Sequence, residues 1–119
     1  MKPQSILAAF VNSFNGLRYF LLNERNGKIQ AGAAIVVTAF GVVLHISATE
    51  WLAVLLCIGA VLSLEMLNSA IEKLCDLVHK EYHPAIKIVK DVSAGAVSFT
   101  AIISVVIACI IFLPKIFSL

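Results

Sequence analysis

The chain has 119 residues and a net charge of only +2, and 61% of its residues are hydrophobic. Soluble domains are roughly 45–50% apolar, so this share, with a mean hydropathy of +0.99, argues against a soluble protein. The length predicts a single domain over residues 1–119, and the small charge without a basic run argues against nucleic-acid binding.

The first predicted element is a helix over residues about 5–24. Apolar side chains recur there every three or four residues, which is one face of an α-helix, and polar side chains lie around the other side. The apolar positions are Ile6, Phe10, Phe14, Leu17 and Leu21. Such a helix suits the membrane surface better than its interior, and Asn26-Gly27 predicts a break after it.

Three apolar stretches follow, at about 29–46, 51–72 and 93–113. Each approaches the roughly 20 residues that a helix needs to cross a bilayer, and only helices satisfy their own backbone there as single segments. The four residues "SATE" at 47–50 leave room for no more than a tight hairpin. We therefore predict an all-α membrane protein with an N-terminal amphipathic surface helix and three transmembrane helices.

The distribution of lysine and arginine predicts the orientation. Besides Lys2 at the start of the chain, seven basic residues precede the first span or separate the second from the third: Arg18, Arg25, Lys28, Lys73, Lys80, Lys87 and Lys90. These segments should face the cytoplasm, whereas the hairpin and the C-terminus should face outward. Lys115 alone opposes this count, and Trp51 suits an interfacial anchor.

Polar side chains lie on one stripe at the cytoplasmic end of the second span. On a helix Glu65, Glu72 and Asp76 fall within about 40° of one another, and Asn68 lies on the same side. Ionisable groups near the membrane core are expensive and usually functional. The simpler interpretation is a stripe that leaves the bilayer and meets water, which explains Asp76 better than Glu65, because Glu65 has apolar neighbours.

The functional interpretation is a cation-phosphate site at the interface. Mg²⁺ typically binds one or two carboxylates together with substrate phosphates. The deeper Glu65 could then take a proton from a group held in lipid, while Glu72 holds the metal. Glu24 and Lys90-Asp91 are predicted at the same membrane face, although a solvated turn residue and an ordinary cytoplasmic lysine are simpler interpretations of Glu24 and Lys90.

Two alternatives remain open at this point. The chain could be a non-catalytic membrane assembly or cation-binding or transport subunit that uses the carboxylate stripe. A transition-metal site is the other alternative, with His79 and His83 one turn apart on a continued helix; its ligands would be Cys75, Asp76, His79 and His83.

The motifs "LEMLNSAIEKLCDL", "EYHP" and "KDVSAGAV", with "NGLR" and "NER" near the start, closely resemble the bacterial integral-membrane diacylglycerol kinase and undecaprenol kinase family. The resemblance implies transfer of the ATP γ-phosphate to a lipid hydroxyl with Mg²⁺. It gives Glu65 as the catalytic base and Glu24 and Glu72 as metal ligands. The ATP site that it implies contains Glu24, Asn68, Glu72, Asp76, Glu81, Tyr82, His83, Lys90 and Asp91.

The resemblance also implies a homotrimer with active sites shared between neighbouring protomers. The enzyme would lie in the bacterial cytoplasmic membrane with its active site facing the cytoplasm. Two branches of the family compete, one using diacylglycerol and the other undecaprenol. "ERN" at Glu24 to Asn26, the proline of "EYHP" and "AGAV" look more like the undecaprenol branch.

Overall fold

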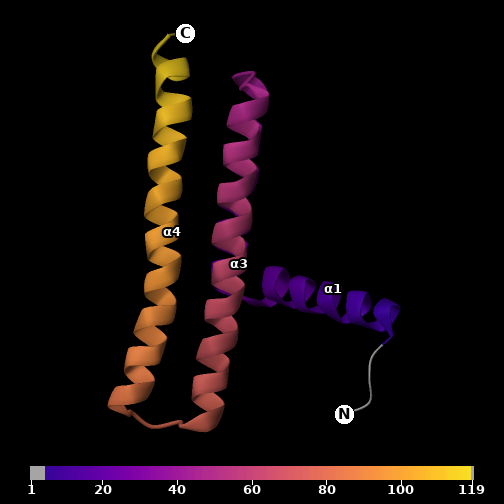
Figure 1. Cartoon of the computed structure of the whole chain (residues 1–119), viewed down its shortest axis with the longest axis vertical. Coiled ribbons are helices and arrows are strands. Elements are labelled where there is room, and N and C mark those ends of the chain that lie inside the picture. The colour runs from indigo at the N-terminus through magenta and orange to yellow at the C-terminus, as the bar shows by residue number, and fades with distance from the viewer. Residues whose placement is uncertain (1–4, 119) are drawn as a thin grey trace.

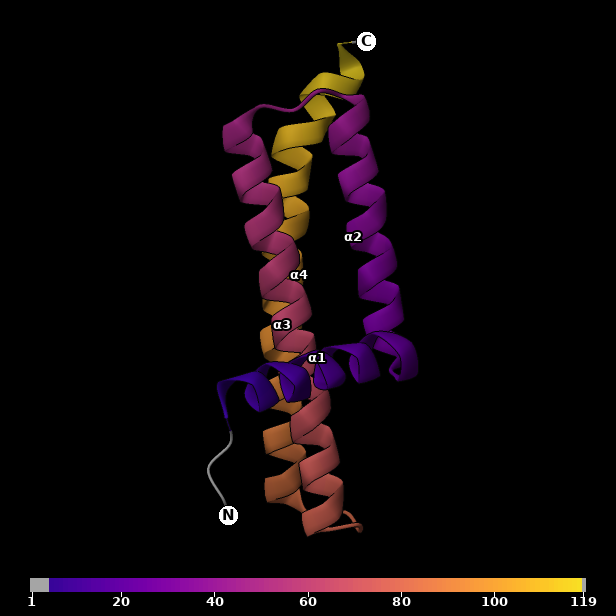
Figure 2. The same ribbon diagram turned by 90° about the vertical axis from the view of Figure 1, so that its right-hand side faces the viewer.

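The computed structural model describes residues 5–118, which form four α-helices and contain no strand. In chain order these are α1 (Ile6–Asn23), α2 (Arg25–Val43), α3 (Ala48–Val78) and α4 (Pro84–Phe117). Helices α3 and α4 run side by side in opposite directions (Figure 1), and α2 stands upright beside them (Figure 2). The all-helical prediction is thus confirmed.

Helices α2, α3 and α4 are each long and apolar enough to cross a membrane. At 1.5 Å per residue α2 is about 28 Å long, close to the hydrocarbon thickness of about 30 Å, whereas α3 and α4 are about 46 and 51 Å long. The surplus length of α3 and α4 lies below the level of α1 in Figure 2. The protein is therefore a membrane protein in which one end of the α3–α4 pair projects beyond the spans.

Helix α1 runs crosswise to the three upright helices, from the lower end of α2 (Figure 2), and extends away from α3 and α4 (Figure 1). The Ser5 hydroxyl begins the helix by accepting a hydrogen bond from the Ala8 backbone N–H at 3.1 Å, a common N-cap. Ile6, Phe10 and Phe14 are 61–79% exposed. A helix that runs crosswise to the spans with an exposed apolar stripe fits the predicted surface helix.

The break between α1 and α2 falls at Glu24, so the predicted break at Asn26-Gly27 is wrong. Glu24 has extended backbone dihedrals, and α2 begins immediately after it. Gly27 is buried where α1 folds back on α2, and an added Cβ would lie 2.5 Å from the Phe20 carbonyl oxygen. The Asn-Gly pair therefore permits a close helix contact here rather than a turn.

The hairpin between α2 and α3 is short because both of its helix ends are capped. His45 adopts a left-handed φ of 52°, and the Ile46 backbone N–H donates to the Gly41 carbonyl at 3.2 Å, as in a Schellman motif. Ser47 and Glu50 then form a capping box at the start of α3. The predicted tight connection is confirmed.

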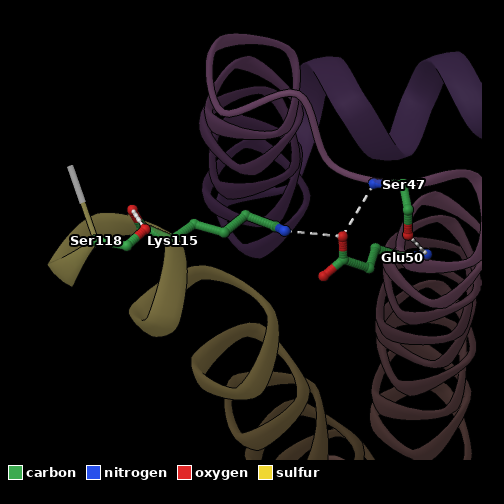
Figure 3. Close-up of polar contacts among 4 residues, drawn as sticks. All are labelled: Ser47, Glu50, Lys115 and Ser118. Carbon is green, nitrogen blue, oxygen red and sulfur yellow. Dashed lines mark hydrogen bonds and ion pairs between the residues drawn. The ribbon is translucent and has the colours of Figure 1, made fainter.

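Glu50 also accounts for the position of Lys115, the lysine that opposed the predicted orientation. The Lys115 Nζ atom near the end of α4 lies 3.1 Å from Glu50 Oε1, which also accepts a hydrogen bond from the Ser47 backbone N–H at 2.9 Å (Figure 3). Lys115 is therefore paired locally with the start of α3, and it joins the two helices at the end of the molecule farthest from α1.

At the other end α3 and α4 extend further than the apolar stretches suggested. Helix α3 continues to Val78, and α4 begins at Pro84, a residue favoured in the first turn of a helix. The charged segment between the predicted spans is thus mostly helical, with only residues 79–83 as a turn. This extension carries three of the predicted site residues, Asp76 on α3 and Lys90 and Asp91 on α4.

Candidate active site

Glu65 is a buried carboxylate on α3, and its side chain is only 3% exposed. The Asn26 Nδ2 atom of α2 donates a hydrogen bond to Glu65 Oε1 at 3.0 Å. Val61 and Leu62, one turn earlier on α3, line an apolar cleft. Glu65 therefore lies between an apolar region on one side and the polar end of the α3–α4 pair on the other.

Asn68 lies about one turn further along the same face of α3 and is 5% exposed. Its Oδ1 atom is buried and accepts no hydrogen bond within the described part of the chain. Buried polar atoms are nearly always hydrogen-bonded. An unpartnered acceptor at this position therefore suits a donor or a cation supplied by a ligand.

Glu24, at the junction of α1 and α2, contacts α3 through an ion pair. Its Oε1 atom is buried and lies 2.8 Å from Lys73 Nζ, a contact without good hydrogen-bond geometry. The neighbour of Lys73 on α3 is Glu72, which is exposed and has no ion pair or hydrogen bond in residues 5–118. The two predicted metal ligands thus lie on elements that touch, although no contact joins the two carboxylates directly.

Asp76 and Lys90 link the projecting parts of α3 and α4. The Lys90 Nζ atom lies 2.6 Å from Asp76 Oδ1. Asp91 pairs instead with Lys87, one turn earlier on α4, at 2.5 Å. All four side chains are at least one-third exposed, so these pairs add little stability and could exchange partners with a charged ligand at low cost.

The turn between α3 and α4 closes a shallow polar cavity of about 220 Å³. Five predicted ATP-site residues line it together with Lys80 and Lys87: Glu81, Tyr82, His83, Lys90 and Asp91. The His83 Nδ1 atom accepts a hydrogen bond from the Ala85 backbone N–H at 3.1 Å, which caps α4. The turn and the start of α4 therefore gather these side chains on one small surface.

The alternative transition-metal site is wrong. Helix α3 ends at Val78, so His79 and His83 do not share a continued helix. Their rings instead meet edge to face across the turn, with centroids 5.4 Å apart. Among residues 5–118, no three histidine, cysteine, aspartate or glutamate side chains come together in a way that could hold a metal ion.

An apolar cleft of about 190 Å³ lies between α2, α3 and α4. Most of its lining side chains are small or aliphatic, and they come from the membrane-spanning parts of all three helices: Ala33, Ala34, Val61, Leu62, Ala101 and Ala108 are among them. Gln30, one turn after Asn26 on α2, also lines it. The cleft therefore begins about one helical turn from the Asn26–Glu65 pair and extends through the membrane-spanning region.

Two residues at this site were missed by sequence reasoning. Asn26 was interpreted as a turn signal and Lys73 as one of several cytoplasmic lysines, yet they contact Glu65 and Glu24. Both contacts join segments far apart in the sequence, and no local pattern reports such a pairing. The only local signals were that Asn26 follows Glu24 closely and that Lys73 is the neighbour of Glu72.

Comparisons with known proteins agree on one family. Residues 11–112 match the profile of prokaryotic diacylglycerol kinase. The chain is 42% identical over 107 residues to the undecaprenol kinase of Bacillus subtilis, covering 90% of this chain and 87% of that protein.

It is also 34% identical to a diacylglycerol kinase of Synechocystis, covering 97% of this chain and 66% of that protein. The diacylglycerol kinase of Escherichia coli is 29% identical over 89% of this chain and 87% of its own length. These matches do not favour the non-catalytic alternative. The chain belongs to the prokaryotic diacylglycerol kinase family and is a membrane-embedded lipid kinase.

Proposed function

We propose that the protein transfers the γ-phosphate of ATP to the hydroxyl group of a membrane lipid alcohol, with undecaprenol as the favoured acceptor and diacylglycerol the next. The observation that carries this proposal is the position of Glu65. Its buried carboxylate stands on α3 between an apolar cleft and a polar surface. A lipid alcohol and a charged nucleotide could meet only at such a boundary.

In this proposal Glu65 acts as the general base that takes the proton of the lipid hydroxyl. A base must lie within hydrogen-bond reach of that proton. Val61 and Leu62, which line the cleft, lie about one turn from Glu65 on α3, so a lipid with its tail in the cleft could extend its hydroxyl to the carboxylate. Because phosphoryl transfer depends mainly on positioning and charge stabilisation, one correctly placed carboxylate suffices as the base.

The polar end of the α3–α4 pair is proposed to bind ATP. Lys90 supplies a positive charge for phosphate, and its present partner Asp76 is exposed. Glu81, Tyr82, His83 and Asp91 line the adjoining cavity, which we assign to the remainder of the nucleotide. In this arrangement Asn68 would lie between the nucleotide region and Glu65, with its unpartnered Oδ1 available to a ligand.

The oxygen donors at the site fit Mg²⁺. Mg²⁺ is commonly held by one or two carboxylates and by substrate phosphates, and Glu24 and Glu72 are carboxylates on touching elements. When bound, Mg²⁺ would neutralise charge that develops on the phosphates. Glu24 is paired with Lys73 in the structure, so its carboxylate is already held toward α3.

We favour undecaprenol over diacylglycerol as the proposed acceptor because two independent features point to it. The undecaprenol kinase of Bacillus subtilis shares 42% identity with the chain, against 34% and 29% for the two diacylglycerol kinases. The cleft is also lined by alanines from α2 and α4, and small side chains leave room for the methyl branches of a polyprenyl chain.

We further propose a homotrimer in the bacterial cytoplasmic membrane, with active sites shared between protomers on the cytoplasmic side. Apart from the backbone of their own helices, no atom of residues 5–118 lies within 4 Å of a Cβ added at Gly59 on α3 or Gly95 on α4, and small residues allow close helix packing in membranes. Native mass spectrometry from detergent should give three copies. A stable, active monomer would contradict the trimer.

The experiment that tests the function is a lipid panel with γ-labelled ATP and Mg²⁺ in mixed micelles. Label should appear in undecaprenyl phosphate, with a higher kcat/KM than for diacylglycerol. Exclusive labelling of diacylglycerol would overturn the choice of acceptor. Absence of label in every lipid alcohol, from a folded and homogeneous protein, would refute the proposed function itself.

A further inference from the structure

Glu65 makes one side-chain hydrogen bond within residues 5–118, and its partner comes from a different helix. Asn26 in the first turn of α2 donates through Nδ2 to Glu65 Oε1 at 3.0 Å. The second carboxylate oxygen, Oε2, has no hydrogen-bond partner in the described part of the chain. One oxygen of this buried carboxylate is therefore held and the other is free.

The backbone that carries Asn26 is itself fixed at the junction of α1 and α2. The Lys28 backbone N–H donates to the Glu24 carbonyl at 3.1 Å, which closes the first turn of α2 around Asn26. The next residue, Gly27, is packed against Phe20, which is 4% exposed. Asn26 is thus presented to α3 from a rigid support, as a residue that orients a catalytic group must be.

We propose that Asn26 is a positioning residue for phosphoryl transfer. Its side-chain amide holds Glu65 Oε1 so that Oε2 faces the lipid hydroxyl. This inference rests on the proposed function of Glu65 as the base. The role belongs to Asn26 alone among the residues near Glu65, because no other side chain in residues 5–118 donates a hydrogen bond to it.

The physical reason is the geometry of a carboxylate in a general-base step. A free carboxylate rotates about its terminal bond, a broad torsion with little intrinsic preference. One amide N–H, which can only donate, selects the rotamer in which Oε1 meets it. A misplacement of about 1 Å in a reacting group can lower a rate by about 100-fold, so holding one oxygen directly affects the other.

The alternative is that this hydrogen bond merely ties α2 to α3. A purely structural tie would lower stability, or expression, without depending on whether residue 65 can act as a base. A positioning role would disappear once the base is removed. A double-mutant cycle on kcat therefore distinguishes the two roles.

The test measures kcat and KM for undecaprenol and MgATP in Asn26→Ala, Glu65→Gln and the double variant. Asn26→Ala should lower kcat about tenfold or more, with both KM values within about twofold of wild type. In the Glu65→Gln background, adding Asn26→Ala should change kcat by less than about twofold. Asn26→Gln keeps the amide donor and should recover part of the lost kcat.

Asn23→Ala is the matched control, because it removes an amide from the same junction whose hydrogen bond stays within α1, to the Tyr19 carbonyl. It should keep kcat near that of wild type. If Asn26→Ala does not fold, Asn26→Leu, which also removes the amide donor but keeps a side chain of similar size, and its double variant with Glu65→Gln carry the same comparison.

Three results would overturn the inference: an unchanged kcat in Asn26→Ala, a change confined to KM, or losses that multiply in the double variant. A wild-type protein without lipid kinase activity would instead refute the proposed function. If wild type and Glu65→Gln behave as expected but Asn26→Ala keeps the kcat of wild type, only the role of Asn26 is refuted.

Discussion

Glu72 and Glu24 occupy different electrostatic positions although both are proposed to bind metal. Glu24 is buried at Oε1 and is held by Lys73, whereas Glu72 is exposed and has no ion pair within residues 5–118. A carboxylate without a partner can accept a divalent cation without first losing an ion pair. Glu72 is therefore the residue whose charge most directly tests the proposed metal site.

Replacing Glu72 by Gln should abolish Mg²⁺-dependent phosphorylation while leaving the folded oligomer intact. Gln keeps the size and helix propensity of Glu but removes its charge, and the position is exposed, so little packing changes. The measurement is phosphate transfer across a Mg²⁺ titration, with size-exclusion chromatography as the control for folding. Turnover equal to that of wild type would remove Glu72 from the metal site.

At the scale of the helices, the junction of α1 and α2 sets the position of both Glu24 and Asn26. Gly27 permits this junction, since an added Cβ would lie 2.5 Å from the Phe20 carbonyl oxygen and 3.0 Å from its ring. A backbone atom cannot move aside as a flexible side-chain end can. Any larger residue at 27 must therefore displace α1 from α2.

We predict that Gly27→Ala lowers both thermal stability and kcat. Overpacking typically costs about 1–3 kcal/mol, which exceeds the gain of up to about 1 kcal/mol from replacing Gly by Ala in a helix. Gly16→Ala is the matched control, because no atom lies within 4 Å of a Cβ there. Thermal unfolding in detergent should show a lower Tm for Gly27→Ala and an equal or higher Tm for Gly16→Ala; the reverse order would refute the close contact.

Periodicity located the N-terminal helix and apolar length located the three spans, but neither showed where the helices end. The apolar repeat beginning at Ile6 placed α1 correctly, because its face is defined by side-chain pattern alone. The span predicted at about 51–72 stopped short of Val78, although the carboxylate stripe already assumed a helix as far as Asp76, since hydropathy falls where a helix leaves lipid while its backbone hydrogen bonds continue. The break predicted at Asn26-Gly27 was wrong for a related reason. The local turn preference of this pair was overridden by the packing of Gly27 on Phe20.

The site was predictable to the extent that it lies on one helix. The stripe of Glu65, Asn68 and Glu72 follows from helical spacing within α3. Its partners on other elements required the tertiary structure: Asn26 is 39 residues from Glu65 in the sequence. The link between Lys90 and Asp76 likewise depends on how α4 turns back along α3.

For the whole molecule, the arrangement of helices agrees with one proposed orientation in the membrane. Helix α1 runs crosswise to the spans at the lower end of α2, and the α3–α4 turn lies beyond its level (Figure 2). The hairpin after α2 and the Lys115–Glu50 ion pair lie at the opposite end. If α1 lies on the cytoplasmic surface, the end of α3 and α4 that we propose binds ATP is in the cytoplasm.

Cysteine labelling in intact cells tests this orientation. The three native cysteines, Cys57, Cys75 and Cys109, are unpaired and can be replaced by alanine to give a background without thiols. Thr49→Cys in the hairpin should then react with an impermeant thiol reagent added outside the cell, whereas Lys80→Cys should react only after lysis. The opposite pattern would place the nucleotide site outside the cell, away from cytoplasmic ATP, and would refute the orientation.

The central claim is that Glu65 is the base that activates a lipid hydroxyl at the boundary between membrane and water. Its most direct test is the steady-state kinetics of Glu65→Gln with undecaprenol and MgATP, alongside direct measurement of nucleotide binding. We expect kcat to fall by about 100-fold or more, as is typical when a general base is lost, while nucleotide and Mg²⁺ affinities change little. Weakened nucleotide binding with an unchanged kcat would instead assign Glu65 to the ATP site and contradict the account.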